Sequence, residues 1–157
     1  MDAFHILLFL HILGAIVAFG PGFASAIVGP MVAKEPQHAN FFARTQMATS
    51  KKLITPLAHS MLLTGIGMIL VRGWGTIVGE THWLEAAIAL YVVALGIAMF
   101  YLAPAGRRLV ELTSTPPAPG SGPNPEIPAT ARKTRIGGMV LTILVVVITF
   151  LMVVKPF

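Results

Sequence analysis

Four long apolar stretches alternate along this chain with shorter segments that carry most of the charged residues and prolines. The first stretch, residues 3–33, contains no Asp, Glu, Lys or Arg. An apolar run of about 18 or more residues is long enough to cross the hydrocarbon core of a membrane, about 30 Å thick, as a helix that rises about 1.5 Å per residue. The pattern therefore predicts four transmembrane helices, at 3–33, 53–71, 83–103 and 136–154.

The composition agrees with a membrane protein. Hydrophobic residues make up 55% of the chain and charged residues 11%, whereas charged residues are about 25% of a typical soluble domain. The 157 residues have room for four spans and no separate soluble domain, so we expect residues 1–157 to form a single all-α domain, a four-helix transmembrane bundle. The chain has no Cys, which excludes disulfides and thiolate chemistry.

Basic residues are concentrated in the first and third connecting segments, whereas the second has Arg72 opposed by Glu80 and Glu85. By the positive-inside rule the basic segments are cytoplasmic, which predicts that both termini lie outside (N-out and C-out). The formal net charge is +5, and its basic residues lie next to apolar spans. We therefore expect the lipid bilayer, with its anionic headgroups, as the partner and not nucleic acid.

Two cytoplasmic segments have a character of their own. Residues 36–50 predict a helical extension before the second span, either a separate interfacial helix or a plain continuation of that span. Residues 113–130 contain six of the 12 prolines and predict a flexible linker. Within the first span, Gly20-Pro21-Gly22 predicts a kink. Ala24-Ser25-Ala26 resembles a signal-peptide cleavage site, but no basic residue precedes it, so we expect the first helix to be retained.

Ionisable side chains deep in a span are costly and are candidate functional residues by default. Here these are His11 and His59. Neutral imidazoles that face a bundle interior are the usual axial ligands of a b-type haem, which makes both residues candidate cofactor ligands. The alternative is that each histidine bonds a Thr, a Ser or a backbone carbonyl as a structural contact. Their predicted depths, about 10 Å and about 18 Å, leave sites with one or two histidine ligands both open.

Small residues follow His11 along one face of the first helix. They are Gly14, Ala18, Gly22 and Ala26. Residues four apart share a helical face, and small side chains at this spacing let two membrane helices approach closely. This face is therefore a predicted packing surface for the second or third helix, or for a partner protein.

A second polar cluster is predicted at the outer surface. His5, Glu80, His82 and Glu85 would lie there, and imidazole together with carboxylate suits Zn or Cu, with His5, His82 and Glu85 as the candidate ligands. The alternative is a solvated rim, in which Glu85 favours the positive N-terminal end of the third helix.

The chain resembles a family of small four-span bacterial membrane proteins, domain of unknown function 2269, in its segments LLFLHILGAIVAFGPGF, KKLITP, LAPAGRRL and ITFLMVVKPF. The resemblance covers nearly the whole chain and implies a multi-pass protein of the bacterial cytoplasmic (inner) membrane, without an assigned activity. A more distant likeness links it to four-helix haem membrane proteins, the protoporphyrinogen oxidase of the HemJ type and the copper-resistance D type. This likeness matches His11 to the early histidine of their first span and implies haem b as cofactor.

Three functional hypotheses follow. The first is a small, non-catalytic membrane subunit or accessory protein that self-associates or joins other membrane subunits, with a b-type haem held in the bundle. The second is a haem- or quinone-dependent membrane oxidoreductase in which His11 ligates the iron and His59 is a second ligand or a proton donor. The third is a copper or small-solute permeation factor that uses Met and His.

Overall fold

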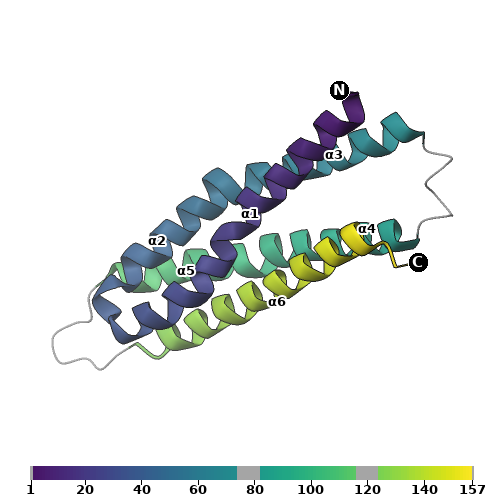
Figure 1. Ribbon diagram of the computed structural model, residues 1–157. Coiled ribbons are helices and arrows are strands. Elements are labelled where there is room, and N and C mark those ends of the chain that lie inside the picture. The colour runs from purple at the N-terminus through teal and green to yellow at the C-terminus, as the bar shows by residue number, and fades with distance from the viewer. Residues whose placement is uncertain (1, 74–81, 116–123, 157) are drawn as a thin grey trace.

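The computed structural model describes residues 2–73, 82–115 and 124–156, and within these ranges the regular structure is entirely helical. The elements are α1 (Ala3–Lys34), η1 (Pro36–His38), α2 (Ala39–Thr49), η2 (Ser50–Ile54), α3 (Thr55–Arg72), α4 (His82–Gly96), η4 (Ile97–Leu102), α5 (Ala103–Ser114) and α6 (Glu126–Val154) (Figure 1). The predicted all-α fold is confirmed.

Four helical runs are long and apolar enough to cross a membrane. They are Ala3–Lys34, Pro36–Arg72, His82–Ser114 and Glu126–Val154. Each contains one of the four predicted spans completely, so the prediction of four transmembrane helices is confirmed. The second run shows that residues 36–50 continue directly into the second span, which is the simpler of the two alternatives for that extension.

The helices form two pairs, with α1 packed along α3 and α4 packed along α6. At one end of the molecule α2, α5 and α6 join the pairs together, and α1 also contacts α6. At the other end α3 and α4 make no backbone contact within the described residues. Figure 1 shows the two pairs separating toward that end, which carries both termini. The end where α2 and α5 lie carries Arg44, Arg107 and Arg132, and we call it the basic end. The bundle is therefore closed at the basic end, and its two helix pairs are apart at the end that carries the termini.

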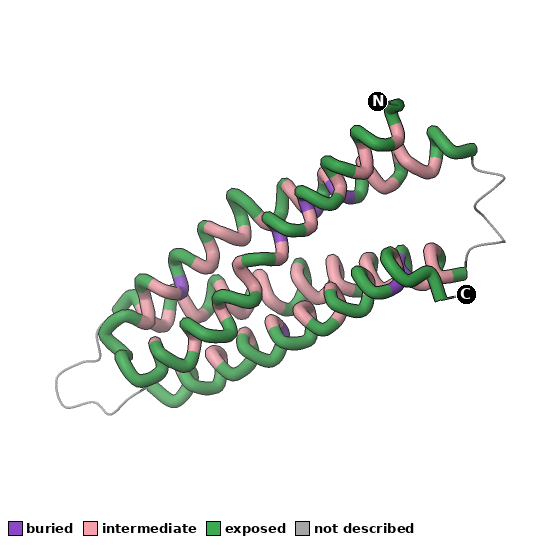
Figure 2. The backbone as a smooth tube through the Cα atoms, in the orientation of Figure 1, coloured by how far each residue is buried: buried purple, intermediate pink, exposed green. Residues whose placement is uncertain are grey.

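Small residues form most of the interior. The buried apolar residues are Ala18, Ala43, Ala58, Met61, Ala87 and Leu151, and Gly14 and Gly137 are also buried. More than half of the large apolar side chains in the described residues are exposed. Figure 2 shows exposed residues along every long helix. Small interior residues and a large apolar exterior are expected of membrane helices, because lipid solvates the exterior and close backbone approach provides the packing.

Each of the two central runs contains a π-helical segment directly before a proline. In η2 the N–H of Thr55 bonds the carbonyl of Ser50, and in η4 the N–H of Ala103 bonds the carbonyl of Ala98. The next residues, Pro56 and Pro104, have no N–H, and a proline ring clashes with the carbonyl four residues earlier. A wider turn immediately before the proline relieves that clash, so both π segments have a local cause.

Two predicted irregularities can be compared with the structure. Pro21 lies inside α1, which is assigned as one helix from Ala3 to Lys34, and a bend within that helix at Gly20-Pro21-Gly22 stays a prediction. Part of the segment predicted as a flexible linker, 113–130, is helical, because α5 continues to Ser114 and α6 begins at Glu126; residues 116–123 lie outside the described residues. A proline is tolerated in the first turn of a helix, where its missing N–H has no intrahelical partner anyway, and this explains Pro128 near the start of α6.

Candidate functional site

His11 lies on the face of α1 that packs against α3. The side chain is partly buried, and its Nδ1 is 3.0 Å from the hydroxyl oxygen of Thr64. That hydroxyl is also within 2.9 Å of the backbone carbonyl of Ser60 and 3.1 Å of that of Met61. The histidine therefore joins two membrane helices through one threonine.

This network favours the tautomer of His11 that is protonated on Nδ1. A threonine hydroxyl has a single proton, and Thr64 donates it to the backbone carbonyl one turn earlier, as threonine commonly does within a helix. Its oxygen then accepts a hydrogen bond, so Nδ1 of His11 is the protonated nitrogen. Nε2 consequently carries the lone pair, which is the form of imidazole that binds a metal.

Glycines give the His11 ring its space. A Cβ atom on Gly65 would lie 3.5 Å from Cε1 of His11, and one on Gly14 would lie 3.1 Å from Cγ of Met61. The first of these distances is ordinary van der Waals contact, whereas the second is tighter than usual. The α1–α3 interface is therefore close-packed at the level of His11, and the ring lies against bare backbone on α3.

His59 is not brought together with His11. It is exposed on α3, and its Nδ1 lies 2.7 Å from the carbonyl oxygen of Thr55 on the same helix. Thr64, the partner of His11, is five residues further along α3, about 7.5 Å by the helical rise. The two predicted ligands thus differ in depth and in surroundings.

The predicted packing face changes its neighbour along α1. Gly14 and Ala18 are buried, and a Cβ atom on Gly22 would lie 3.7 Å from the hydroxyl oxygen of Thr142 on α6. Ala26, one turn further, is exposed. The face therefore contacts α3, the second span, as predicted, and then α6 of the fourth span, which was not among the predicted neighbours.

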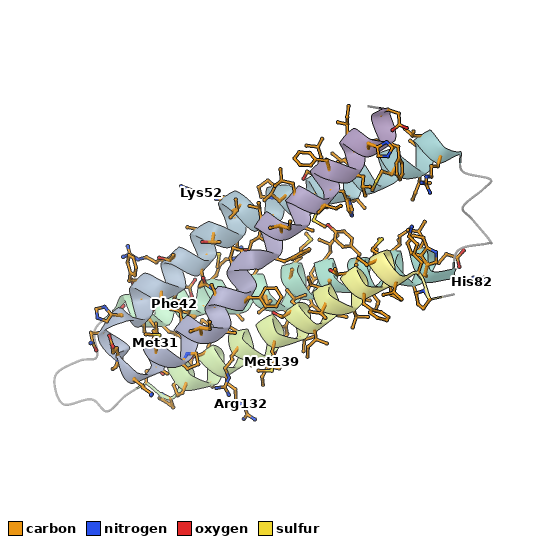
Figure 3. All side chains as sticks on the ribbon, viewed as in Figure 1. Met31, Phe42, Lys52, His82, Arg132 and Met139 are labelled. Carbon is orange, nitrogen blue, oxygen red and sulfur yellow. The ribbon has the colours of Figure 1, made fainter. Side chains whose placement is uncertain are left out.

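The outer residues form two separate pairs. His5 bonds Asp2 on the N-terminal turn at 2.6 Å, and His82 lies 3.4 Å from Glu85 on α4. Figure 3 places His82 near the end that carries the termini. The backbone N–H and the ring of His5 both bond the Asp2 carboxylate, which lowers the pKa of Asp2. Among the described residues, no three His, Asp or Glu side chains gather in a group that would hold a metal ion.

The architecture of four long apolar helices agrees with a comparison of the sequence to known families. The family model described as a predicted integral membrane protein (DUF2269) matches residues 5–156. The chain belongs to this family. No curated protein matches it, and no solved structure does. The further likeness to HemJ-type and copper-resistance D-type proteins stays a prediction.

In this DUF2269 chain, sequence reasoning missed the polar contacts that connect the helices. The hydroxyl of Tyr91 on α4 donates to the carbonyl of Ala58 on α3 at 2.6 Å, which links the two helix pairs. Near the basic end, the amide of Asn40 on α2 donates to the hydroxyl oxygen of Thr113 on α5 at 3.1 Å. For Tyr91 the available signal was a polar side chain in an apolar helix, which predicts a buried contact but not its partner. Asn40 and Thr113 lie in helices with several polar residues, so no such signal distinguished them.

Proposed function

We propose that this protein is a small, non-catalytic membrane subunit or accessory protein that holds a b-type haem through His11. The observation that carries the proposal is the contact of 3.0 Å between Nδ1 of His11 and the hydroxyl oxygen of Thr64. When Nδ1 is the donor in this contact, Nε2 keeps the lone pair that binds a metal. Haem-ligating histidines commonly have the other ring nitrogen fixed by a hydrogen bond in this way. When bound, the haem would supply one-electron redox chemistry, and the chain would supply the ligand and its orientation.

The surroundings of the two histidines support a single histidine ligand. His11 is partly buried at a helix interface, whereas His59 is exposed and bonds its own helix. A histidine ligand in a bundle projects from one helix toward the space shared with the others, and His11 meets that description better. The proposal therefore assigns haem ligation to His11 and a structural contact to His59.

The test is the visible absorption spectrum of the protein purified in mild detergent from haem-sufficient cells, oxidised and then reduced with dithionite. A Soret band and a reduced b-type peak are expected in the wild type. His11→Gln keeps a side chain that can bond Thr64 but removes the imidazole, so the haem bands should be lost. His59→Ala is the matched control and should keep them.

Two results would contradict the haem proposal. One is a wild-type spectrum without a Soret band. The other is a Soret band that His11→Gln retains at full intensity in a preparation that elutes as a single folded species. In either case the bond between His11 and Thr64 would be a structural contact, and the search for function would turn to co-purifying membrane proteins.

We also infer that the protein lies in a bacterial cytoplasmic membrane with its basic end in the cytoplasm. Arg107, Arg108, Arg132, Lys133 and Arg135 all lie on α5 and α6 near one end, and Figure 3 shows Arg132 at the end opposite His82. Segments rich in Lys and Arg stay on the cytoplasmic side during membrane insertion.

This orientation is tested by reporter fusions to the C-terminus in a bacterial host. Alkaline phosphatase fused there should be active, because that enzyme matures outside the cytoplasm, and a cytoplasmic fluorescent reporter at the same position should be dark. The reverse pair of results would place the termini inside.

A further inference from the structure

The surface formed by η4, α5 and the start of α6 has two adjoining hollows, of about 370 and 230 Å³, near the basic end of the bundle. The first is lined by η4 and α5, and the second by η4, α5 and α6. Both are lined by Phe100, Pro104 and Arg108, and we call this region the α5–α6 surface. Arg107 lines the first hollow and Lys133 lines the second. The region is open to the outside of the bundle and belongs to neither histidine described above.

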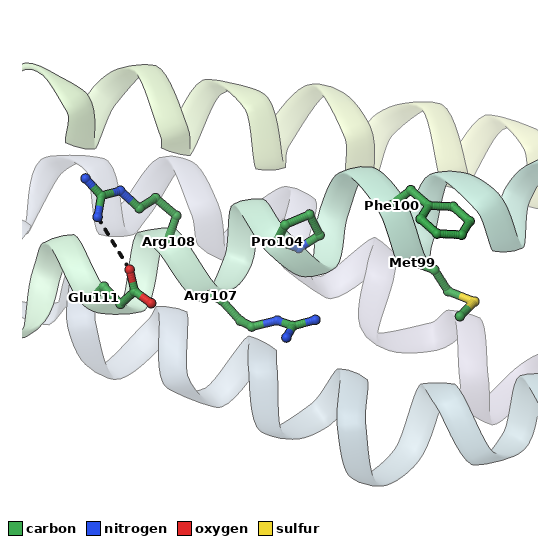
Figure 4. A pocket seen from close by; sticks show the side chains of 6 residues that line it. All are labelled: Met99, Phe100, Pro104, Arg107, Arg108 and Glu111. Carbon is green, nitrogen blue, oxygen red and sulfur yellow. Dashed lines mark hydrogen bonds and ion pairs between the residues drawn. The ribbon is translucent and has the colours of Figure 1, made fainter.

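The charges of the α5–α6 surface are only partly neutralised. Arg108 bonds Glu126 on α6 at 2.7 Å and Glu111 on α5 at 3.4 Å. Arg107 and Lys133 have no ion pair within the described residues, although each lines a hollow beside Arg108. Figure 4 shows the Arg107 side chain extending toward Met99 and away from Glu111. Arg107 and Lys133 therefore keep their positive charges without an ion-pair partner in the described residues, whereas the charge of Arg108 is neutralised.

Apolar side chains lie directly beside these cations. Phe100 is 82% exposed and Met99 is 58% exposed, on the side of the hollows nearer the middle of the span. A free inorganic anion would use the cations but not this apolar surface. A molecule with an anionic head and an apolar tail would contact both.

We propose that the α5–α6 surface binds an anionic phospholipid of the surrounding bilayer. Arg107 in the first hollow and Lys133 in the second attract the anionic headgroup, and the acyl chains lie over Phe100 and Met99. The bonds from Glu111 and Glu126 keep Arg108 fixed between them. Basic pockets between membrane helices at the cytoplasmic side are suited to anionic lipid headgroups. This inference does not depend on haem binding.

The test counts lipids bound to the detergent-purified full chain by native mass spectrometry, during titration with dioleoylphosphatidylglycerol or dioleoylphosphatidylcholine. The wild type should bind phosphatidylglycerol more tightly. The double variant Arg107→Gln, Lys133→Gln should lose about 30-fold in that affinity, because each basic side chain near an anionic lipid contributes about fivefold. Glu111→Gln should raise the affinity, since it removes a carboxylate from the first hollow.

Lys51→Gln, Lys52→Gln is the matched control, because it removes the same charge from exposed positions on η2. It should change the affinity less than twofold, and an equal loss in both double variants would overturn the proposal. Displacement of phosphatidylglycerol by equimolar inorganic phosphate would also overturn it, in favour of a site for free anions. Arg107→Lys, Lys133→Arg retains both charges and should retain binding; if it loses as much as the glutamine variant, charge is not the basis of recognition.

Discussion

Gly137→Leu is expected to destabilise the folded protein by about 3 kcal/mol. Gly137 is buried on α6, and a Cβ atom there would lie 2.7 Å from Cδ2 of Leu102 and 3.0 Å from Cδ1 of Tyr101. Both neighbours belong to the π segment η4, so a larger side chain would push α6 away from that segment. The measurement is the thermal unfolding temperature in detergent, followed by intrinsic fluorescence.

Gly138→Leu is the matched control for this prediction. Gly138 is the next residue on the same helix, and a Cβ atom there meets nothing within 4 Å. Both substitutions replace glycine with the same good helix former and change helix propensity equally. The difference between their unfolding temperatures therefore measures the cost of the steric contact at Gly137. If the two variants unfold at the same temperature, the close contact between α6 and η4 does not exist in the protein.

Gly14→Leu is expected to separate α1 from α3 and to cost about 2–3 kcal/mol of stability. The Cβ atom would lie 3.1 Å from Cγ of Met61, which is itself buried on α3, so Met61 has little room to move. The same movement would lengthen the bond between His11 and Thr64, one turn away. A fall in unfolding temperature and a change in elution from a size-exclusion column are the expected results.

Gly20→Leu on the same helix provides the comparison, since nothing lies within 4 Å of a Cβ atom at Gly20. It should unfold close to the wild-type temperature. Wild-type stability and an unchanged oligomeric state for Gly14→Leu would show that α1 and α3 do not pack through Gly14.

The spans could be predicted because the length of an apolar stretch must match the thickness of the hydrocarbon core of the membrane. The ends of the helices could not. The predicted third span stops at residue 103, before Arg107 and Arg108, yet the helix continues to Ser114. Charged residues end a membrane crossing, but they are good helix formers and do not end a helix. Likewise the prolines near the start of α6 suggested a linker, although one of them lies in a first turn that tolerates proline.

The candidate site could be predicted only in part, for a related reason. His11 shares a helical face with Gly14 and Ala18, and small residues distinguish that face from the large apolar residues around it. His59 has no such marker, because the lipid-facing and interior sides of α3 are both apolar. In a soluble helix the polar face would reveal which side is outside. The contact of Tyr91 with Ala58 required knowledge of which helices are neighbours, and no local pattern carries that information.

The separation of the two helix pairs gives the molecule the shape of a wedge. Toward the termini α3 and α4 make no backbone contact within the described residues, whereas at the basic end α2 contacts α5 and α5 contacts α6. The predicted second span begins at residue 53 and the predicted third span ends at residue 103, so α2 and nearly all of α5 lie beyond the predicted crossings. The contacts that close the wedge are therefore made beside the membrane, by segments that hydropathy alone leaves out of the bundle.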